Sequence, residues 1–127
     1  MNETTLVRLL MLSASKLGLR LFRNNVGALQ DKKGSWIKYG VCNPGGSDLI
    51  GWSEVQVTPQ MVGKTVCIFT AVEAKSETGR LSQHQKAFLD AVKAAGGVAI
   101  IARSVEDLEQ ALGELEKWVP GRLISSG

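Results

Sequence analysis

Three residues with ionisable side chains stand where the sequence otherwise predicts apolar strands. Asp48 follows a glycine-rich turn and begins an apolar stretch, and Glu73 interrupts a nearly continuous apolar stretch, with Lys75 two residues later. Because side chains alternate between the faces of a strand, Glu73 and Lys75 are expected to point the same way, about 6–7 Å apart along the strand. A buried carboxylate is costly unless it is paired or binds a cation. This pattern is suited to holding a divalent metal beside a group that transfers a proton or stabilises charge.

Other chemistries find less support in the sequence. His84 is the only histidine and no nucleophile motif accompanies it, so we interpret it as an exposed residue in the first turn of a helix. Cys42 and Cys67 have neither zinc-site spacing nor a disulfide pattern, and Cys67 is predicted to be a buried small apolar residue in a reducing compartment. Gly-Lys-Thr at 63–65 resembles the end of a P-loop, but Thr58 stands where that motif requires glycine.

The acidic residues belong to longer strings that follow one another along the chain. These strings are Arg-Asn-Asn-Val-Gly at 23–27, Pro-Gly-Gly-Ser-Asp-Leu-Ile-Gly at 44–51, Val-Glu-Ala-Lys-Ser-Glu-Thr-Gly-Arg-Leu-Ser at 72–82 and Gln-Lys-Ala-Phe-Leu at 85–89. Asp48 with Glu73-Ala74-Lys75 resembles the signature of PD-(D/E)xK nucleases. Taken together and in this order, the four sequence segments resemble the virus-type replication-repair nuclease (VRR-NUC) domain over about residues 3–105. One departure is Ser47, where the name of the wider superfamily expects proline.

The resemblance implies a phosphodiesterase that acts on nucleic acid with Mg²⁺ or Mn²⁺. It implies that Asp48 and Glu73 ligate the metal, and that the backbone carbonyl of Ala74 is a further oxygen ligand of the kind that hard cations prefer. Lys75 would position or help to activate the attacking water and stabilise charge on the phosphate. Without the resemblance, Asp48 is also compatible with a turn residue, and Glu73 with Lys75 with a structural pair at a sheet edge.

Two further residues match the family pattern. The resemblance implies that Glu3, in the first helix, completes the metal shell directly or through water, and that Gln85 orients Lys75 or the water. Each has a structural alternative. A carboxylate in a first helical turn is favoured by the helix dipole, and Ser82 with Gln85 forms the spacing of a capping box.

Basic residues near these strings are candidates for DNA contact. Interleaved cations and aromatic rings, the latter Trp36 and Tyr39, suit phosphate binding and base stacking. The alternative is a solvated loop with Trp36 packed on the core. The predicted DNA-binding residues are Arg23, Asn25, Lys32, Lys33, Lys38 and Arg80.

The elements that must position these residues follow from hydrophobic periodicity and from start and stop signals. The sequence predicts helices over 3–18, 82–95 and 104–118, strands over 19–25, 48–52, 64–75 and 98–102, and a loop over 27–47 with a short strand at 36–39. The strand over 64–75 is expected to be covered on both faces, because its apolar run is nearly continuous. Helices that alternate with buried strands indicate a three-layer α/β domain over residues 1–127. The resemblance specifies a restriction-endonuclease-like α/β/α core with a mixed central sheet.

Composition and charge limit the classes of protein that fit. Hydrophobic residues make up 44% and charged residues 21%, which excludes a disordered or fibrous chain. Residues 1–103 carry a net charge of +6 and residues 104–127 one of −3. The basic body suits a polyanionic partner, and on charge alone it suits a solvated surface equally well. No apolar run is long enough for a membrane helix and residues 1–4 lack a basic lead, so we expect no membrane contact, no signal peptide and a cytoplasmic location, that of the host cell if the protein is viral.

By resemblance, the activity is that of a homodimeric endonuclease that cuts four-way junctions or other branched DNA in viral replication or repair. One alternative is a nucleic-acid-binding module without catalysis. Another is a nuclease subunit that is active only with replication or repair partner proteins. The apolar face of the last predicted helix is a candidate dimer interface, although it is equally suited to covering the sheet; its residues are Leu108, Leu112, Leu115 and Trp118.

Overall fold

The computed structural model describes residues 1–121, and the chain forms two compact units, Met1–Val55 and Gln56–Gly127. Residues 122–127 lie outside the described residues. No helix in the described part of the chain is both long and apolar enough to cross a membrane. The single domain over residues 1–127 stays a prediction.

The first unit begins with helix α1 (Glu3–Lys16), as the periodicity predicts. Asn2 caps the helix, because its side-chain oxygen accepts a hydrogen bond from the Thr5 amide at 2.8 Å. Gly18 ends it with a φ of +81°, a conformation that glycine adopts without steric cost. The buried residues Val7 and Ala14 lie on one face of α1, two helical turns apart.

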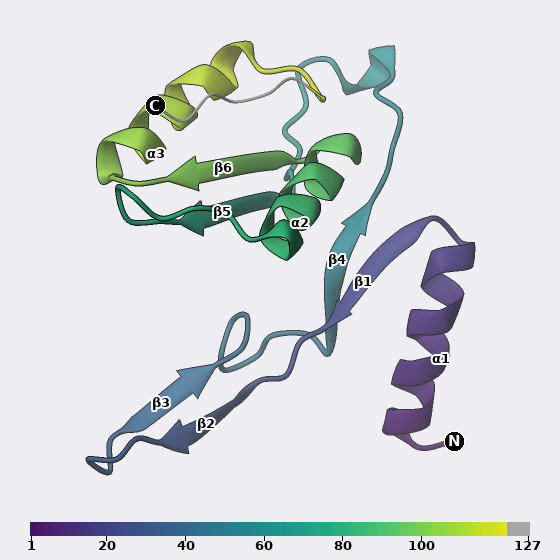
Figure 1. Ribbon diagram of the computed structural model, residues 1–127. Helices are drawn as coiled ribbons and strands as arrows, with labels where there is room; N and C mark the ends of the chain where they lie inside the picture. Colours follow the sequence, from purple (N-terminus) through teal and green to yellow (C-terminus); the bar gives the residue numbers. More distant parts are fainter. Residues whose placement is uncertain (122–127) are drawn as a thin grey trace. The chain divides into compact units, whose positions relative to one another are not determined.

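Strand β1 (Leu19–Arg23) follows α1 and pairs antiparallel with β4 (Leu49–Ser53). Gly51 is required in this ladder, because a Cβ atom there would collide with the backbone of Arg20. The pairing places Leu49 opposite Arg23, the last residue of β1. Residues at the end of β1 and at the start of β4 are therefore neighbours (Figure 1).

Residues 27–47 contain more strand than the sequence predicts. Strands β2 (Gly27–Gln30) and β3 (Trp36–Tyr39) pair antiparallel as a hairpin, so the loop predicted over 27–35 is partly wrong. The Asp31 carboxylate closes the turn by accepting hydrogen bonds from the amides of Lys33 and Ser35, each at 2.9 Å. The strand at 27–30 could not be recognised because Gly-Ala-Leu-Gln lacks the alternation and the β-branched residues that mark strands.

The second unit is built around β5 (Thr70–Ala74) and β6 (Val98–Ala102), which pair in parallel. Helix α2 (Gln83–Ala94) connects the two strands, and the 3₁₀ helix η1 (Pro59–Met61) precedes them. Helix α3 (Val105–Glu114) and the 3₁₀ helix η2 (Leu115–Lys117) follow β6 (Figure 1). A parallel pair requires a crossover of this length, and a helix is its usual form.

The two helices of the second unit cover opposite faces of this sheet. Val98, Ile100 and Ala111 form the buried cluster, which places α3 on the face of the even-numbered residues of β6. Gln85 of α2 contacts Glu73, which pairs with Ile101 and therefore lies on the opposite face. Leu115 and Trp118 pack against the buried cluster, so this end of the last helical segment covers the sheet.

The long strand predicted over residues 64–75 is shorter and more exposed than predicted. Only Thr70–Ala74 forms a strand, with exposed and half-buried residues in alternation, and Val72 is 48% exposed. Within this unit α3 packs on β6, so the corresponding face of β5 lacks a cover. Cys67 is exposed, so the prediction that it is buried is wrong. The exposed residues 64–67 precede Ile68, which packs against the buried cluster, and none of these four residues forms a strand.

The chain as a whole is a mixed α/β protein. In the described residues its strands form three two-stranded sheets, of which two are antiparallel and one is parallel. The coarse fold class that we predicted is confirmed. A single mixed central sheet within three layers stays a prediction.

Candidate functional site

The predicted pair on β5 lies on one face of the strand. The Lys75 ammonium stands 3.8 Å from Oε1 of Glu73, and the two side chains are 19% and 29% exposed. Glu73 and Lys75 therefore point the same way, as strand alternation predicts. At this distance the contact is an ion pair without a short hydrogen bond, so the ammonium keeps donor capacity for another oxygen.

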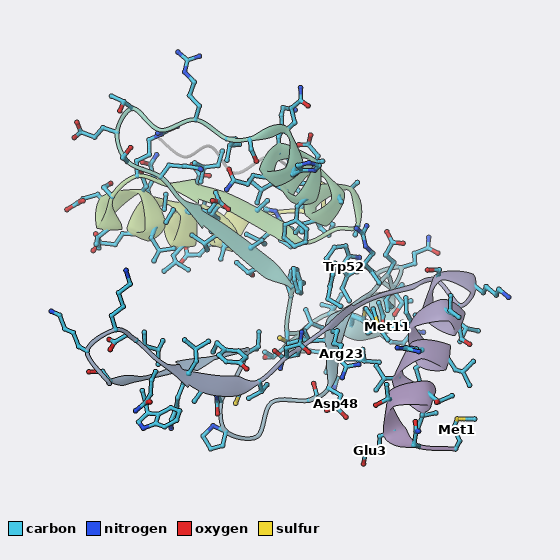
Figure 2. The ribbon with its side chains drawn as sticks, turned by 60° about the horizontal axis from the view of Figure 1, so that its bottom comes forward. Met1, Glu3, Met11, Arg23, Asp48 and Trp52 are labelled. Carbon is cyan, nitrogen blue, oxygen red and sulfur yellow. The ribbon has the colours of Figure 1, made fainter. Side chains whose placement is uncertain are left out.

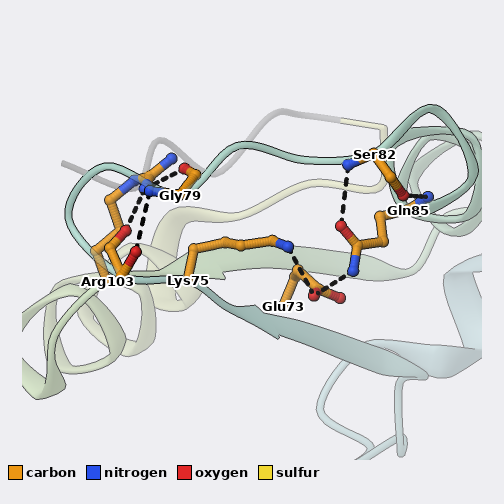
Figure 3. A network of polar contacts seen from close by, with 7 residues as sticks. Glu73, Lys75, Gly79, Ser82, Gln85 and Arg103 are labelled. Atoms are coloured by element: carbon orange, nitrogen blue, oxygen red, sulfur yellow. Dashed lines mark hydrogen bonds and ion pairs between the residues drawn. The ribbon is translucent and has the colours of Figure 1, made fainter.

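Gln85 connects this pair to the start of α2. Its amide nitrogen donates a hydrogen bond to Oε1 of Glu73 at 2.9 Å, and its amide oxygen accepts one from the Ser82 amide at 3.0 Å. The backbone N–H of Gln85 in turn donates to the Ser82 hydroxyl, which completes the capping box (Figure 3). The capping contact and the contact with Glu73 coexist, and capping fixes the rotamer that reaches Glu73.

The carbonyl of Ala74 points away from β6. In the parallel ladder, the Val98 amide donates to the Phe69 carbonyl and the Lys75 amide donates to the Ala102 carbonyl. The odd-numbered residues of β5 thus bond to β6, and the carbonyls of even-numbered residues such as Ala74 face the other edge. The Ala74 carbonyl oxygen therefore forms no hydrogen bond with β6, and Ala74 directly follows Glu73 in the sequence.

Arg103 is a residue of this region that the sequence analysis did not single out. Its Nη1 donates to the carbonyls of Ser76, Glu77 and Gly79, at 2.6, 3.3 and 2.7 Å, in the loop that follows Lys75 (Figure 3). One signal could have found it. Arg103 directly follows β6 as Lys75 follows β5, and the ends of neighbouring parallel strands lie at one edge of the sheet.

In the first unit, Asp48 stands at the end of a loop that asparagine side chains hold. Asn24 accepts from the Val41 amide at 2.8 Å and donates to the carbonyls of Val41 and Ser47, each at 3.0 Å. Gly46 lies against this network, and a Cβ atom there would collide with the Val41 carbonyl. No local signal in the sequence marks Asn24 as the residue that holds this loop, because its partners are 17 and 23 residues away.

Asp48 itself is exposed, and within residues 1–55 its side chain makes no hydrogen bond or ion pair. It lines an open cleft of about 520 Å³ on the first unit, and Arg23 stands nearby at the end of β1 (Figure 2). A carboxylate without internal partners beside a cation is suited to binding an external ligand. The residues that line the cleft are Arg23, Asn24, Asn25, Val26, Tyr39, Gly46 and Asp48.

Glu3 lies in the first turn of α1, which follows the Asn2 cap (Figure 2). In the described residues, no three His, Cys, Asp or Glu side chains gather into a group that could hold a metal ion. The structure brings Glu73, Lys75 and Gln85 together in the second unit. Glu3 and Asp48 belong to the first unit, and their shared site with Glu73 stays a prediction.

The predicted DNA-binding residues are distributed over several elements. Lys32 and Lys33 lie in the turn of the β2–β3 hairpin, and Lys38 lies on β3. Trp36 is 69% exposed, so the alternative in which it packs on the core is wrong. Arg23 and Asn25 flank Asn24 and are joined by a hydrogen bond of 3.1 Å, whereas Arg80 follows the loop that Arg103 holds.

The remaining reactive side chains are exposed. His84 lies in the first turn of α2 and is exposed, as predicted. Cys42 and Cys67 are free thiols, and both are exposed. None of these three residues joins a polar network within the described part of the chain that resembles a triad or a zinc site.

Of three comparisons with known proteins, one found a match. No curated protein and no solved structure matches the chain. The family model of the VRR-NUC domain matches residues 9–106, a range that contains Asp48, Glu73, Lys75 and Gln85 but not Glu3. Because this match spans most of the chain, the protein belongs to the VRR-NUC family, whose members are nucleases of the PD-(D/E)xK type.

Proposed function

We propose that the protein is a Mg²⁺- or Mn²⁺-dependent endonuclease that hydrolyses phosphodiesters of branched DNA, such as four-way junctions. The observation that carries this proposal is the arrangement of Glu73, Lys75 and Gln85 in a chain of this family. The same contacts are compatible with a structural pair, and membership in a family of nucleases is what favours catalysis. The selection of branched DNA, the homodimer and the viral role rest on the resemblance alone.

The donor atoms fit a hard divalent cation. Mg²⁺ and Mn²⁺ prefer carboxylate and carbonyl oxygens. Both Lys75 and Gln85 contact Oε1 of Glu73, which leaves Oε2 for a cation, and the Ala74 carbonyl is turned away from β6. Asp48 lacks an internal partner in its own unit. We propose that the Glu73 and Asp48 carboxylates and the Ala74 carbonyl ligate the metal. Glu3 is proposed as a further ligand, direct or through water.

The roles of the protein groups follow from their charge. A bound cation polarises the phosphate and makes a coordinated water a stronger nucleophile. Lys75 neutralises charge that develops on the phosphate, because its ammonium is held near the metal ligand and retains free donors. Gln85 fixes the rotamer of Glu73 through its hydrogen bond, so the carboxylate does not have to be reoriented when the cation binds.

The hairpin β2–β3 is the proposed contact with the DNA backbone and bases. Lys32, Lys33 and Lys38 supply positive charge, and the exposed ring of Trp36 is available to stack on a base. When a junction is opened at its branch point, base faces lose their stacking neighbours there, so a stacking residue would gain a partner. Two sites related by a two-fold axis suit two symmetric cuts, which is the reason to propose a homodimer.

The decisive experiment is cleavage of labelled four-way junction, flap, single-stranded and duplex DNA with Mg²⁺, Mn²⁺ or EDTA. Glu73→Ala and Lys75→Ala are measured beside the wild type, and Lys64→Ala is the matched control because it removes an exposed lysine of the same unit. Metal-dependent cutting that Glu73→Ala and Lys75→Ala abolish supports the proposal, and the junction is expected to be cut fastest.

Tight DNA binding without cutting under any metal would favour a binding module or a subunit that needs a partner. The oligomeric state is tested separately by sedimentation velocity. A monomer at micromolar concentration, with and without junction DNA, argues against paired symmetric cuts.

A further inference from the structure

We infer that Arg103 is a positioning residue that fixes the loop after β5 and thereby holds Lys75 in place for the reaction. The inference rests on the proposed nuclease function. It adds a residue that lies 28 positions after Lys75 in the chain and outside the string Glu73-Ala74-Lys75.

The guanidinium of Arg103 organises the loop through its backbone. One nitrogen, Nη1, donates to the carbonyls of Ser76, Glu77 and Gly79. In addition, the Gly79 amide donates to the hydroxyl and the carbonyl of Ser76, at 3.1 and 3.2 Å. Hydrogen bonds from a charged donor are stronger than neutral ones, so three carbonyls that converge on one cation define the shape of this loop.

The loop returns to the side chain of Lys75. A Cβ atom built on Gly79 would lie 3.6 Å from Cδ of Lys75 and 3.0 Å from Oγ of Ser76. The backbone of Gly79 therefore passes close to the middle of the lysine side chain, which is only 19% exposed. A loop in this position limits the rotamers of Lys75 and keeps its ammonium beside Glu73.

Arg103 is itself anchored from the other side of the strand end. Its backbone amide donates to Oδ2 of Asp107 at 2.8 Å, and the Asp107 amide donates to the hydroxyl of Ser104 at 3.1 Å. These contacts form the start of α3, which packs on the core of the second unit. The path runs from the packed helix through Arg103 and the loop to Lys75, and every link is a contact within one unit.

The geometry favours a positioning role over a direct DNA contact. A phosphate-binding arginine directs its planar fork outward to two oxygens. Here the hydrogen bonds of Nη1 go to carbonyls of the protein, and the group is half-buried. Loss of Arg103 should therefore slow the chemical step more than it weakens DNA binding.

The test compares Arg103→Gln with the wild type and with Lys64→Gln, which removes one exposed positive charge from the same unit. Single-turnover cleavage of labelled four-way junction is measured at saturating DNA and Mg²⁺, and the Kd for the same DNA is measured in EDTA at several salt concentrations. We expect Arg103→Gln to lower the rate about 10- to 100-fold, as loss of a supporting residue does at metal sites. The Kd is expected to change less than about threefold and its salt slope not at all, since a lost phosphate contact would lower the slope by about one.

Hydrogen exchange at the Gly79 amide is the second measurement. It is expected to become faster by about tenfold or more in Arg103→Gln and to stay unchanged in Lys64→Gln, because the loop loses its charge-assisted hydrogen bonds. If Arg103→Gln does not fold, Arg103→Lys replaces it. An ammonium lacks the guanidinium fork, so the same changes are expected at smaller size.

The outcomes separate this inference from the proposed function. A weaker Kd that accounts for the rate loss, with a shallower salt slope, would show that Arg103 contacts DNA and overturn the inference. An unchanged rate with faster exchange would show a role in loop stability alone, which also overturns it. If the wild type cuts no DNA, the proposed function fails, and unchanged Gly79 exchange in the variant would independently refute the hold of Arg103 on the loop.

Discussion

The two units differ in how their contacts hold the carboxylates of Asp48 and Glu73. In the first unit the backbone is held and the side chain is not, since Asn24 binds the loop before Asp48 while the Asp48 carboxylate is exposed. In the second unit the side chain itself is held, because Gln85 and Lys75 both contact Oε1 of Glu73.

This difference has an energetic meaning. A half-buried carboxylate needs partners in the absence of a cation, whereas an exposed one is solvated by water. Glu73 therefore contributes to the stability of its unit, and Asp48 is available to an external ligand without loss of an internal contact. The two residues should behave alike in catalysis and differently in folding.

The strongest way to test this comparison is to neutralise each carboxylate. Asp48→Asn and Glu73→Gln are both expected to lower cleavage by on the order of 1,000-fold if each residue is an anionic metal ligand, as proposed. Their effects on unfolding should differ. Asp48→Asn should leave the free energy of unfolding within about 0.5 kcal/mol of wild type. Glu73→Gln should lower it by about 1 kcal/mol, because the Lys75 ammonium loses its anionic partner.

Urea unfolding and single-turnover cleavage of the same preparations measure the two effects. Equal loss of stability in both variants would contradict the comparison, since it would give Asp48 a structural role that its exposure does not suggest. Full activity in either variant would remove that residue from the site.

The next effect concerns the held backbone of the first unit. Asn24→Ala removes three hydrogen bonds to the loop before Asp48, so we expect a loss of about 2–3 kcal/mol in unfolding free energy. Cleavage should fall up to about 100-fold in the folded protein, as it does when supporting residues of a metal site are lost. Asn24→Asp is the matched variant, because it keeps the acceptor for the Val41 amide but loses both donor bonds. A normal cleavage rate in both would show that the loop does not position Asp48.

Two residues of one capping box test whether Gln85 holds the side chain of Glu73 in the second unit. Gln85→Ala and Ser82→Ala each remove a capping contact of α2, so each should lower stability by about 1 kcal/mol. Only Gln85→Ala also removes the hydrogen bond to Glu73, and it should slow cleavage about tenfold. The same rate in both variants would mean that Gln85 acts on the helix alone.

Features with a local signal could be predicted from the sequence. Helix α1 with its Asn2 cap, α2 with its capping box and the strand Val98–Ala102 all lie where short-range patterns indicate. The common face of Glu73 and Lys75 follows from strand alternation, which holds wherever a strand forms.

Features that depend on distant contacts could not be predicted. The grip of Asn24 on Val41 and Ser47, and that of Arg103 on the loop from Ser76, join residues separated by 17 to 27 positions. The exposure of β5 depends on where α3 packs, which the apolar run of residues 64–75 does not encode. Local propensity sets the elements, and packing decides their burial and their loops.

The smallest expected effect is on DNA binding by the β2–β3 hairpin, which belongs to the same unit as Asp48. Lys32, Lys33 and Lys38 changed together to glutamine should raise the Kd for junction DNA about fivefold at about 0.1 M salt, because fewer counterions are released on binding. The salt slope should fall by about two to three, and the cleavage rate at saturating DNA should stay near wild type. The control changes Arg8, Lys16 and Lys64, which removes the same charge elsewhere. An equal loss of slope in the control would show a diffuse field of the basic chain, whereas an unchanged slope in the hairpin variant would remove β2–β3 from the DNA-binding surface.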